Sequence, residues 1–264
     1  MIEIGSWDVH LTRKENQAIG NRLFQYCWAR EIAEKKGFCF ITDPIPGFPE
    51  TYKILPGKKI DNNVLFTGVC PSTGAPTQIF NMNEIYDHSG KIRIHGYPQR
   101  YEYYAFNKNN ISKWLTIENE ELYDIPDEDD IVLHVRLGDY LNSGSNLSIE
   151  YYKSILKKEK YKNAYIITDD PNNQEICKLI DFGCILKDNS MFDSMTSMAD
   201  FVFAKKAKKI IISPSTFSWW AAFLGEGIVY FPSGLSPIWG KSPGINDIDL
   251  RVLDDPRYKF VEEF

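Results

Sequence analysis

The fold is decided by one stretch, Ile131-Val132-Leu133-His134-Val135-Arg136-Leu137-Gly138-Asp139-Tyr140, in which an apolar run ends in charged residues. A short apolar run of this kind predicts a strand that is buried on both faces of a parallel sheet. Because side chains alternate along a strand, His134 and Arg136 point to the same side. Gly138 lets the chain turn sharply off the strand, and the turn brings Asp139 to the same end. We therefore expect polar chemistry at the carboxyl end of a buried strand.

Arg136 allows two interpretations. A guanidinium at the end of a buried strand needs a partner, and its planar fork matches the oxygens of a ligand diphosphate. Alternatively, Arg136 forms an ion pair with Asp139 or with another carboxylate of the fold. Residue spacing alone does not separate the two.

Regular elements follow this stretch in alternation. The expected strands are 130–136, 164–168, 184–186, 208–213 and 227–231, and the expected helices are 148–157, 171–180, 191–206 and 216–224. Strands separated by helices predict an α/β fold with a parallel sheet covered by helices on both faces. This half of the chain therefore reads as a Rossmann-like domain.

The part of the chain before it is less regular. From Gly20 to Gly37, apolar residues recur at helical spacing and two lysines precede the glycine, which predicts a helix. Residues 38–42 predict a short strand, and the stretch to about residue 92 is rich in Pro, Gly and Asn, with elements that we leave unassigned. The acidic segment 118–130 has the composition of a linker, so we expect an N-terminal domain over residues 1–125 and a C-terminal domain over residues 126–264.

Two further places have polar residues at the start of a helix. Ser215 and Thr216 follow one predicted strand and precede a predicted helix, whose free N–H groups and positive dipole end favour a diphosphate. Gly20 and Asn21 lead into the first helix in the same way. Simple helix capping is the commoner use of such residues, and taken singly it is the plainer interpretation of both places.

The composition argues against several classes of partner and ligand. A formal charge of -6 and a pI near 5.4 argue against nucleic acid as a partner. The five cysteines are odd in number and form no CxxC pair, and no leader or membrane-spanning run is evident, so we expect a cytoplasmic protein, with peripheral attachment to the inner face of a membrane as an open alternative. The four histidines lack the spacing of a zinc site, and we expect no metal. Asp247-Ile248-Asp249 has the DxD form of metal-dependent transferases, but it follows the last regular element, and we interpret it as solvated.

Four segments match a known pattern in the same order. Residues 20–26 (GNRLFQY), 96–104 (GYPQRYEYY), 134–140 (HVRLGDY) and 215–222 (STFSWWAA) are similar to GNQLFQY, GYxQxxKYF, HxRRGDY and SSFSWWGA, respectively. These four motifs belong to the bacterial α-1,2-fucosyltransferases of glycosyltransferase family 11, and the chain resembles that family over most of its length.

The resemblance implies a GT-B-type architecture with two Rossmann-like domains, the N-terminal one small, irregular and on the acceptor side, and the C-terminal one binding a GDP-sugar. It implies that Arg136 contacts the diphosphate and is essential, and that Asp200 reads the guanine edge; an exposed helix residue is the alternative for Asp200. Asp139 is the first choice for the general base, with Asp169 or Asp170 as alternatives. The remaining candidate donor contacts are His134, Gly138, Asp169, Ser215, Thr216, Gly20 and Asn21.

The implied reaction is an inverting displacement that moves L-fucose from GDP-fucose to a hydroxyl of a glycan acceptor, O2 of a galactoside, without a cofactor or a metal. The alternatives are a non-catalytic nucleotide- or glycan-binding protein of the same fold, and transfer of another GDP-sugar or to another acceptor. Two departures stand out. Leu137 replaces the family's second arginine, which removes one cationic group near the phosphates, and Arg22 replaces a glutamine beside the first helix.

Overall fold

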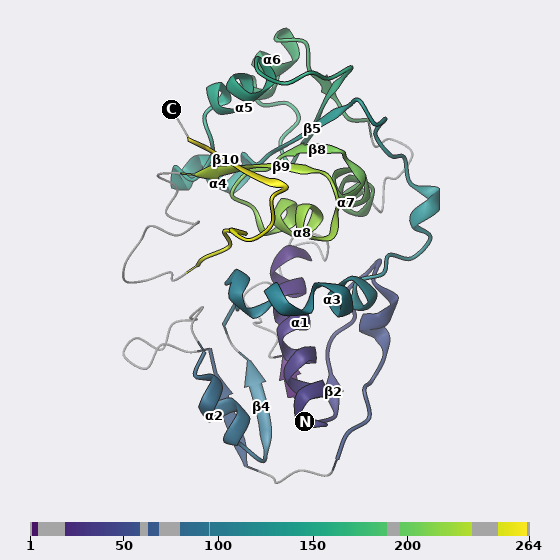
Figure 1. Ribbon diagram of the computed structural model, residues 1–264, viewed down its shortest axis with the longest axis vertical. Coiled ribbons are helices and arrows are strands. Elements are labelled where there is room, and N and C mark those ends of the chain that lie inside the picture. The colour runs from purple at the N-terminus through teal and green to yellow at the C-terminus, as the bar shows by residue number, and fades with distance from the viewer. Residues whose placement is uncertain are drawn as a thin grey trace. The chain divides into compact units, whose positions relative to one another are not determined.

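The computed structural model describes residues 2–4, 19–58, 63–68, 80–94, 96–188, 196–233 and 248–262 (Figure 1). Within these residues the chain forms two compact units, each built on a parallel sheet. The first unit holds the described residues up to Glu118 together with residues 248–250, and the second holds the rest. None of the described helices is both long enough and apolar enough to cross a membrane.

The sheet of the second unit has six strands in the order β10-β9-β8-β5-β6-β7, and all of its neighbouring pairs are parallel. The strands are β5 (Ile131–Val135), β6 (Ala164–Thr168), β7 (Ile185–Leu186), β8 (Lys209–Ile211), β9 (Ile228–Ser233) and β10 (Tyr258–Glu262). The first five confirm the predicted strands. The sixth, β10, was not predicted.

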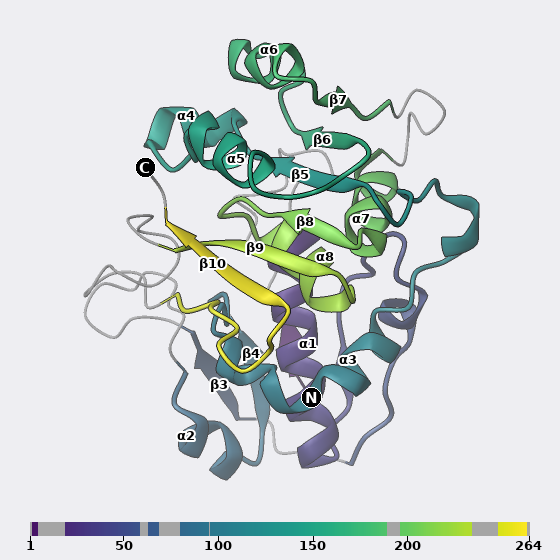
Figure 2. The ribbon, with the colours of Figure 1, turned by 45° about the horizontal axis from the view of Figure 1, so that its top comes forward.

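Helices cover this sheet on both faces. They are α4 (Gly138–Ser143), α5 (Ile149–Leu156), α6 (Gln174–Asp181), α7 (Thr196–Lys206) and α8 (Thr216–Leu224), and a 3-10 turn, η6 (Glu120–Leu122), precedes them. In two views, α5 and α6 lie on one side of the sheet and α7 and α8 on the other (Figures 1 and 2). The predicted α/β class with a parallel, doubly covered sheet is therefore confirmed. Residues 191–195 of the predicted helix 191–206 lie outside the described residues.

The strand order of this sheet has a reversal point. From β5 the chain moves outward through β6 to β7, and it then returns to β8, on the other side of β5, before moving outward through β9 to β10. In open parallel sheets, the crevice at the carboxyl ends of the two strands that flank such a reversal is the usual ligand site. The topology therefore points to the carboxyl ends of β5 and β8.

Strand β5 is rigidly held at this point. All five of its residues are buried, and its Ile131, Leu133 and Val135 pack in one apolar cluster with α5 and α6. The hydroxyl of Tyr152, from α5, donates a hydrogen bond to the backbone oxygen of His134 at 3.1 Å. Packed interiors resist deformation, so side chains at the end of β5 have a fixed position.

The first unit contains a four-stranded parallel sheet in the order β2-β1-β4-β3. Its strands are β1 (Ile2–Ile4), β2 (Phe40–Ile41), β3 (Val64–Thr67) and β4 (Lys91–Ile94); its helices are α1 (Ile19–Lys36), α2 (Met82–Asp87) and α3 (Lys108–Trp114); and its 3-10 turns are η3 (Pro49–Tyr52), η4 (Tyr101–Tyr103) and η5 (Ala105–Asn107). The predicted first helix is confirmed as α1, and the strand predicted at 38–42 appears as β2. The backbone of Asp249 pairs with this unit through Arg100 and Tyr101, whereas Asp247 of the DxD sequence lies outside the described residues.

Candidate functional site

His134 joins the carboxyl ends of β5 and β8. Its Nδ1 lies 2.7 Å from Oγ of Ser213, and its ring stacks on that of Phe217, with centroids 5.3 Å apart. Burial, with a further contribution from the charge of Arg136, lowers the pKa of His134 from 6.5 to about 3. The imidazole is therefore neutral at ordinary pH, and it acts as a hydrogen-bonding brace between the two strands.

Arg136 makes the ion pairs that the sequence offered as one of two interpretations. Its Nη2 lies 2.5 Å from Oδ1 of Asp139, its Nη1 lies 2.8 Å from Oδ2 of Asp169, and its guanidinium carbon is 5.3 Å from the centroid of the Tyr140 ring. The Arg136 side chain nevertheless keeps 27% of its surface exposed. A guanidinium has five N–H donors, and the two observed pairs use only part of them.

Of the two carboxylates that pair with Arg136, Asp169 is the more firmly held. Its Oδ1 accepts a hydrogen bond from the backbone N–H of Leu137 at 2.9 Å, while its Oδ2 faces Arg136. A Cβ added to Gly138 would lie 2.2 Å from that same Oδ2, so only glycine lets the carboxylate approach this closely. Both oxygens of this candidate donor contact are thus bonded within the chain. Its neighbour Asp170 accepts a hydrogen bond from the side chain of Asn173.

Leu137 lies in the core. Its side chain is fully buried in the apolar cluster beneath the sheet, alongside Leu147 and Tyr151. The position that matches the family's second arginine therefore contributes packing in this chain, and the cationic character of the segment rests on Arg136.

The start of α8 does not use its first hydroxyl for capping. Ser215 is the N-cap residue and is buried, yet its side chain accepts no capping hydrogen bond, so simple capping is wrong for this residue. Thr216 begins the helix and is half-buried. Ser218 donates within the turn, to the backbone oxygens of Ser213 and Ser215, at 3.2 Å each. The amino terminus of a nine-residue helix is thus available at the carboxyl end of β8.

Asp200 is buried in α7, with 9% of its surface exposed, so the alternative of an exposed helix residue is wrong. The next residue, Phe201, meets the edge of the Phe217 ring at a centroid distance of 5.4 Å. Because Phe217 also stacks on His134, the aromatic pair links α7 and α8 to the end of β5. These rings are the residues that the sequence analysis did not single out, although Phe217 lies inside a matched motif.

Gly20 and Asn21 lie in the first unit, in the first turn of α1. Oδ1 of Asn21 accepts a hydrogen bond from the amide of Gln99 at 2.8 Å, and the amide of Gln25 donates to the backbone oxygen of Gly96 at 3.1 Å. These bonds join the matched segment at 20–26 to the one at 96–104. Arg22, which replaces a glutamine, donates to the backbone oxygen of Pro44 at 2.5 Å and so holds a loop.

The structure therefore brings most of the candidate residues together in the second unit, at the end of the sheet marked by the strand reversal. Arg136, Gly138, Asp139 and Asp169 form one connected group, and the His134–Ser213 bond ties it to the start of α8. Such a group offers a guanidinium and a helix amino terminus, both suited to an anionic phosphate.

Known proteins share this part of the chain. The family described as glycosyl transferase family 11 matches residues 82–231. An alpha-1,2-colitosyltransferase from Escherichia coli is 26% identical over 181 residues, which are 61% of this chain and 60% of the length of that protein. Because the matched region exceeds half of the chain and includes both the Arg136 segment and the start of α8, the chain belongs to glycosyl transferase family 11.

Proposed function

We propose that this protein is an inverting, metal-independent fucosyltransferase that moves L-fucose from GDP-fucose to O2 of a galactoside in a glycan acceptor. The observation that carries the proposal is the position of Arg136, partly exposed at the strand reversal, at the end of β5, whose neighbour β8 leads into the amino terminus of α8. Family membership supports glycosyl transfer in general. In the proposed GT-B arrangement, the second unit binds the donor and the first unit binds the acceptor.

The proposed chemistry places the leaving GDP against positive charge. As the bond to the sugar breaks, negative charge grows on the diphosphate, and Arg136 together with the N–H groups at Ser215 and Thr216 stabilises it. A phosphate that enters this site competes with Asp139 for Arg136. Release of the Asp139 carboxylate makes it the candidate general base for the acceptor hydroxyl, while Asp169 keeps the guanidinium in place.

Asp200 supports a guanine nucleotide as the donor. A buried carboxylate can accept from the two neighbouring N–H donors on the edge of guanine. The four described cysteines are free thiols, which supports a reducing compartment such as the cytoplasm.

Colitose is the second candidate for the transferred sugar, because the Escherichia coli relative is named for it. Thermal unfolding with GDP, UDP, GDP-fucose, GDP-colitose and GDP-mannose distinguishes the donors, and a ligand present at 100 times its Kd adds about 2.7 kcal/mol of stability. Stabilisation by GDP and GDP-fucose, followed by transfer to lactose, is the expected result. Stabilisation by GDP-fucose without release of GDP identifies a non-catalytic binding protein, and stabilisation by UDP alone contradicts the proposed donor class.

A further inference from the structure

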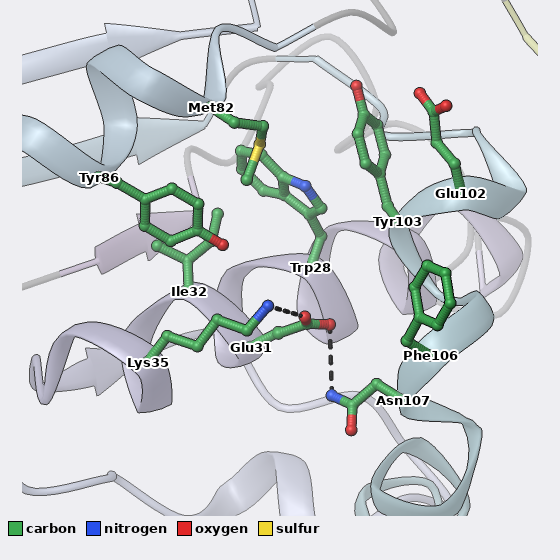
Figure 3. Close-up of a pocket in the computed structure, with 10 residues that line it drawn as sticks. All are labelled: Trp28, Glu31, Ile32, Lys35, Met82, Tyr86, Glu102, Tyr103, Phe106 and Asn107. Atoms are coloured by element: carbon green, nitrogen blue, oxygen red, sulfur yellow. Dashed lines mark hydrogen bonds and ion pairs between the residues drawn. The ribbon is translucent and has the colours of Figure 1, made fainter.

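The first unit contains a pocket of about 170 Å³, none of whose lining residues belongs to the candidate donor site (Figure 3). The last two turns of α1, the helix α2 and the turns η4 and η5 supply its walls. Ten residues separate its Glu31 from Asn21, which corresponds to about 15 Å along a helix. The pocket is therefore separate from the matched segment at the start of α1, although its Glu102 and Tyr103 belong to the matched segment 96–104.

The charged groups of the pocket are already paired. Oε1 of Glu31 lies 2.6 Å from Nζ of Lys35, and Oε2 of Glu31 accepts a hydrogen bond from the amide of Asn107 at 3.2 Å. Glu102, on the opposite wall, pairs with Arg100 at 2.7 Å. A small ion, whether an anion or a cation, would find no uncompensated charge here. The same carboxylates and amide still offer lone pairs and N–H groups to an uncharged ligand with hydroxyl groups.

Aromatic surface lies next to these polar groups. Phe106 stands at the rim with 99% of its surface exposed, and the half-buried Tyr103 lies beside it (Figure 3). A single exposed apolar side chain is common, but here the exposed ring borders a hollow lined with carboxylates. A ligand that has both an apolar face and hydroxyl edges fits such a border.

Trp28 forms part of the inner wall and has an unsatisfied donor. Its side chain is 2% exposed, and its Nε1 has no hydrogen-bond partner among the residues that the structure describes. A buried donor without an acceptor is destabilising, so an acceptor from outside the chain is favoured at this place. In Figure 3 the nitrogen faces the ring of Tyr103, which a ligand oxygen has to displace in order to reach it.

We propose that this pocket binds one uncharged sugar ring of the glycan acceptor, distinct from the ring that receives the transferred sugar. The volume is below the roughly 300 to 1,000 Å³ of sites for drug-sized ligands, which limits the occupant to about one ring. One face of the ring packs on Phe106, its hydroxyls bond to Glu31 and Glu102, and a further oxygen accepts from Trp28. Only the identification of the ring as part of an acceptor rests on the proposed function.

Saturation-transfer NMR on the full chain tests the pocket, with galactose, glucose and N-acetylglucosamine as separate probes. We expect at least one of the three sugars to receive saturation from the protein, which shows that it binds. Phe106→Ala removes the rim platform and should weaken that binding about fivefold to tenfold. Trp28→Phe keeps an aromatic ring but removes the N–H donor, with an expected weakening of about threefold. The matched control is Phe66→Ala, which removes another exposed phenylalanine of the same unit, 55% exposed on β3, and should leave binding unchanged.

The possible results distinguish failure of the pocket proposal from failure of the proposed reaction. Because Phe106 is exposed, its replacement leaves folding intact, so the test does not depend on the buried Trp28 variant. The proposal is overturned if none of the three sugars gives a saturation-transfer signal, or if the Phe106 and Phe66 variants bind the sugar equally well. GDP binding is measured in parallel: sugar binding that depends on Phe106 in a chain that fails to bind GDP upholds the pocket and rejects the proposed donor class.

Discussion

The two units use their matched motifs in different ways. In the second unit, Arg136, Asp139 and Thr216 of the matched motifs are charged or hydroxylated, follow the ends of strands, and keep part of their surface exposed. In the first unit, Gln25 and Gln99 are buried. The side-chain amide of Gln25 donates a hydrogen bond to the backbone oxygen of Gly96, and that of Gln99 donates one to Asn21. These motif residues therefore offer groups for chemistry in the second unit, whereas the two glutamines of the first unit hold matched segments together.

Arg136→Ala has the largest expected effect, and it tests the chemical side of this comparison. Removing a charged donor from the leaving diphosphate should lower turnover about 100- to 1,000-fold while the fold remains intact. Steady-state transfer kinetics and the midpoint of thermal unfolding measure the two quantities.

Arg257→Ala is the matched control for this variant. Arg257 belongs to the same unit, but it binds Asp255 and the backbone oxygens of Gly225 and Gly227, so its replacement should lower stability and leave turnover per folded molecule unchanged. Unchanged turnover in Arg136→Ala would falsify the assigned role of this residue.

Gly138→Ala should have the next largest effect. Its new Cβ meets Oδ2 of Asp169 at 2.2 Å, and the carboxylate that holds Arg136 must move away. Misplacement of the guanidinium should lower turnover roughly tenfold to 100-fold, as measured by transfer kinetics at saturating donor.

The first unit offers an equally crowded glycine as the control. A Cβ at Gly90 would lie 2.2 Å from the backbone oxygen of Asn63, so Gly90→Ala should cost about 1 to 3 kcal/mol of stability. Its turnover per folded molecule should not change. Equal losses of turnover in the two glycine variants would remove the distinction between the units.

His134 gives the second unit an acid-sensitive stability. The folded chain binds a proton at His134 only near pH 3, whereas the unfolded chain binds it near pH 6.5. Between these values unfolding takes up a proton, so stability falls as pH falls, with a slope of up to about 1.4 kcal/mol per pH unit.

Urea unfolding at pH 7, 6, 5 and 4 measures this dependence. Carboxylates contribute to the same curve, so the relevant quantity is the difference from His134→Asn, which cannot take up the proton. Parallel curves for the two proteins show that burial does not suppress protonation of His134.

The sequence predicted the second unit more completely because its elements have strong local signals. β6 and α8 were predicted with their observed bounds, since one is a short apolar run and the other follows a serine, a residue type that is common at helix starts. β10 was missed, because only Tyr258 of its five residues is buried and an edge strand of this kind lacks an apolar pattern.

Contacts between segments that are distant in sequence could not be predicted from local sequence patterns. Arg136 and Asp169 are both visible as charged residues after strands, but their contact depends on β5 and β6 being neighbours. In the first unit, β1 has three residues, which is too short for a periodic signal. The burial of Leu137 could not be predicted, because its neighbours in sequence are polar and its position faces the core only after the chain turns.

Gln25→Leu has the smallest expected effect and tests the structural side of the comparison. The variant leaves the backbone oxygen of Gly96 without its 3.1 Å partner in a buried place, which should cost about 1 to 2 kcal/mol of unfolding free energy. Urea unfolding measures this loss, and GDP titration, monitored by calorimetry, should return an unchanged Kd, because the bond lies in the first unit. If stability stays constant while GDP binds ten times more weakly, then the Gln25 segment takes part in donor binding. The matched motifs of the two units would in that case share one chemical role.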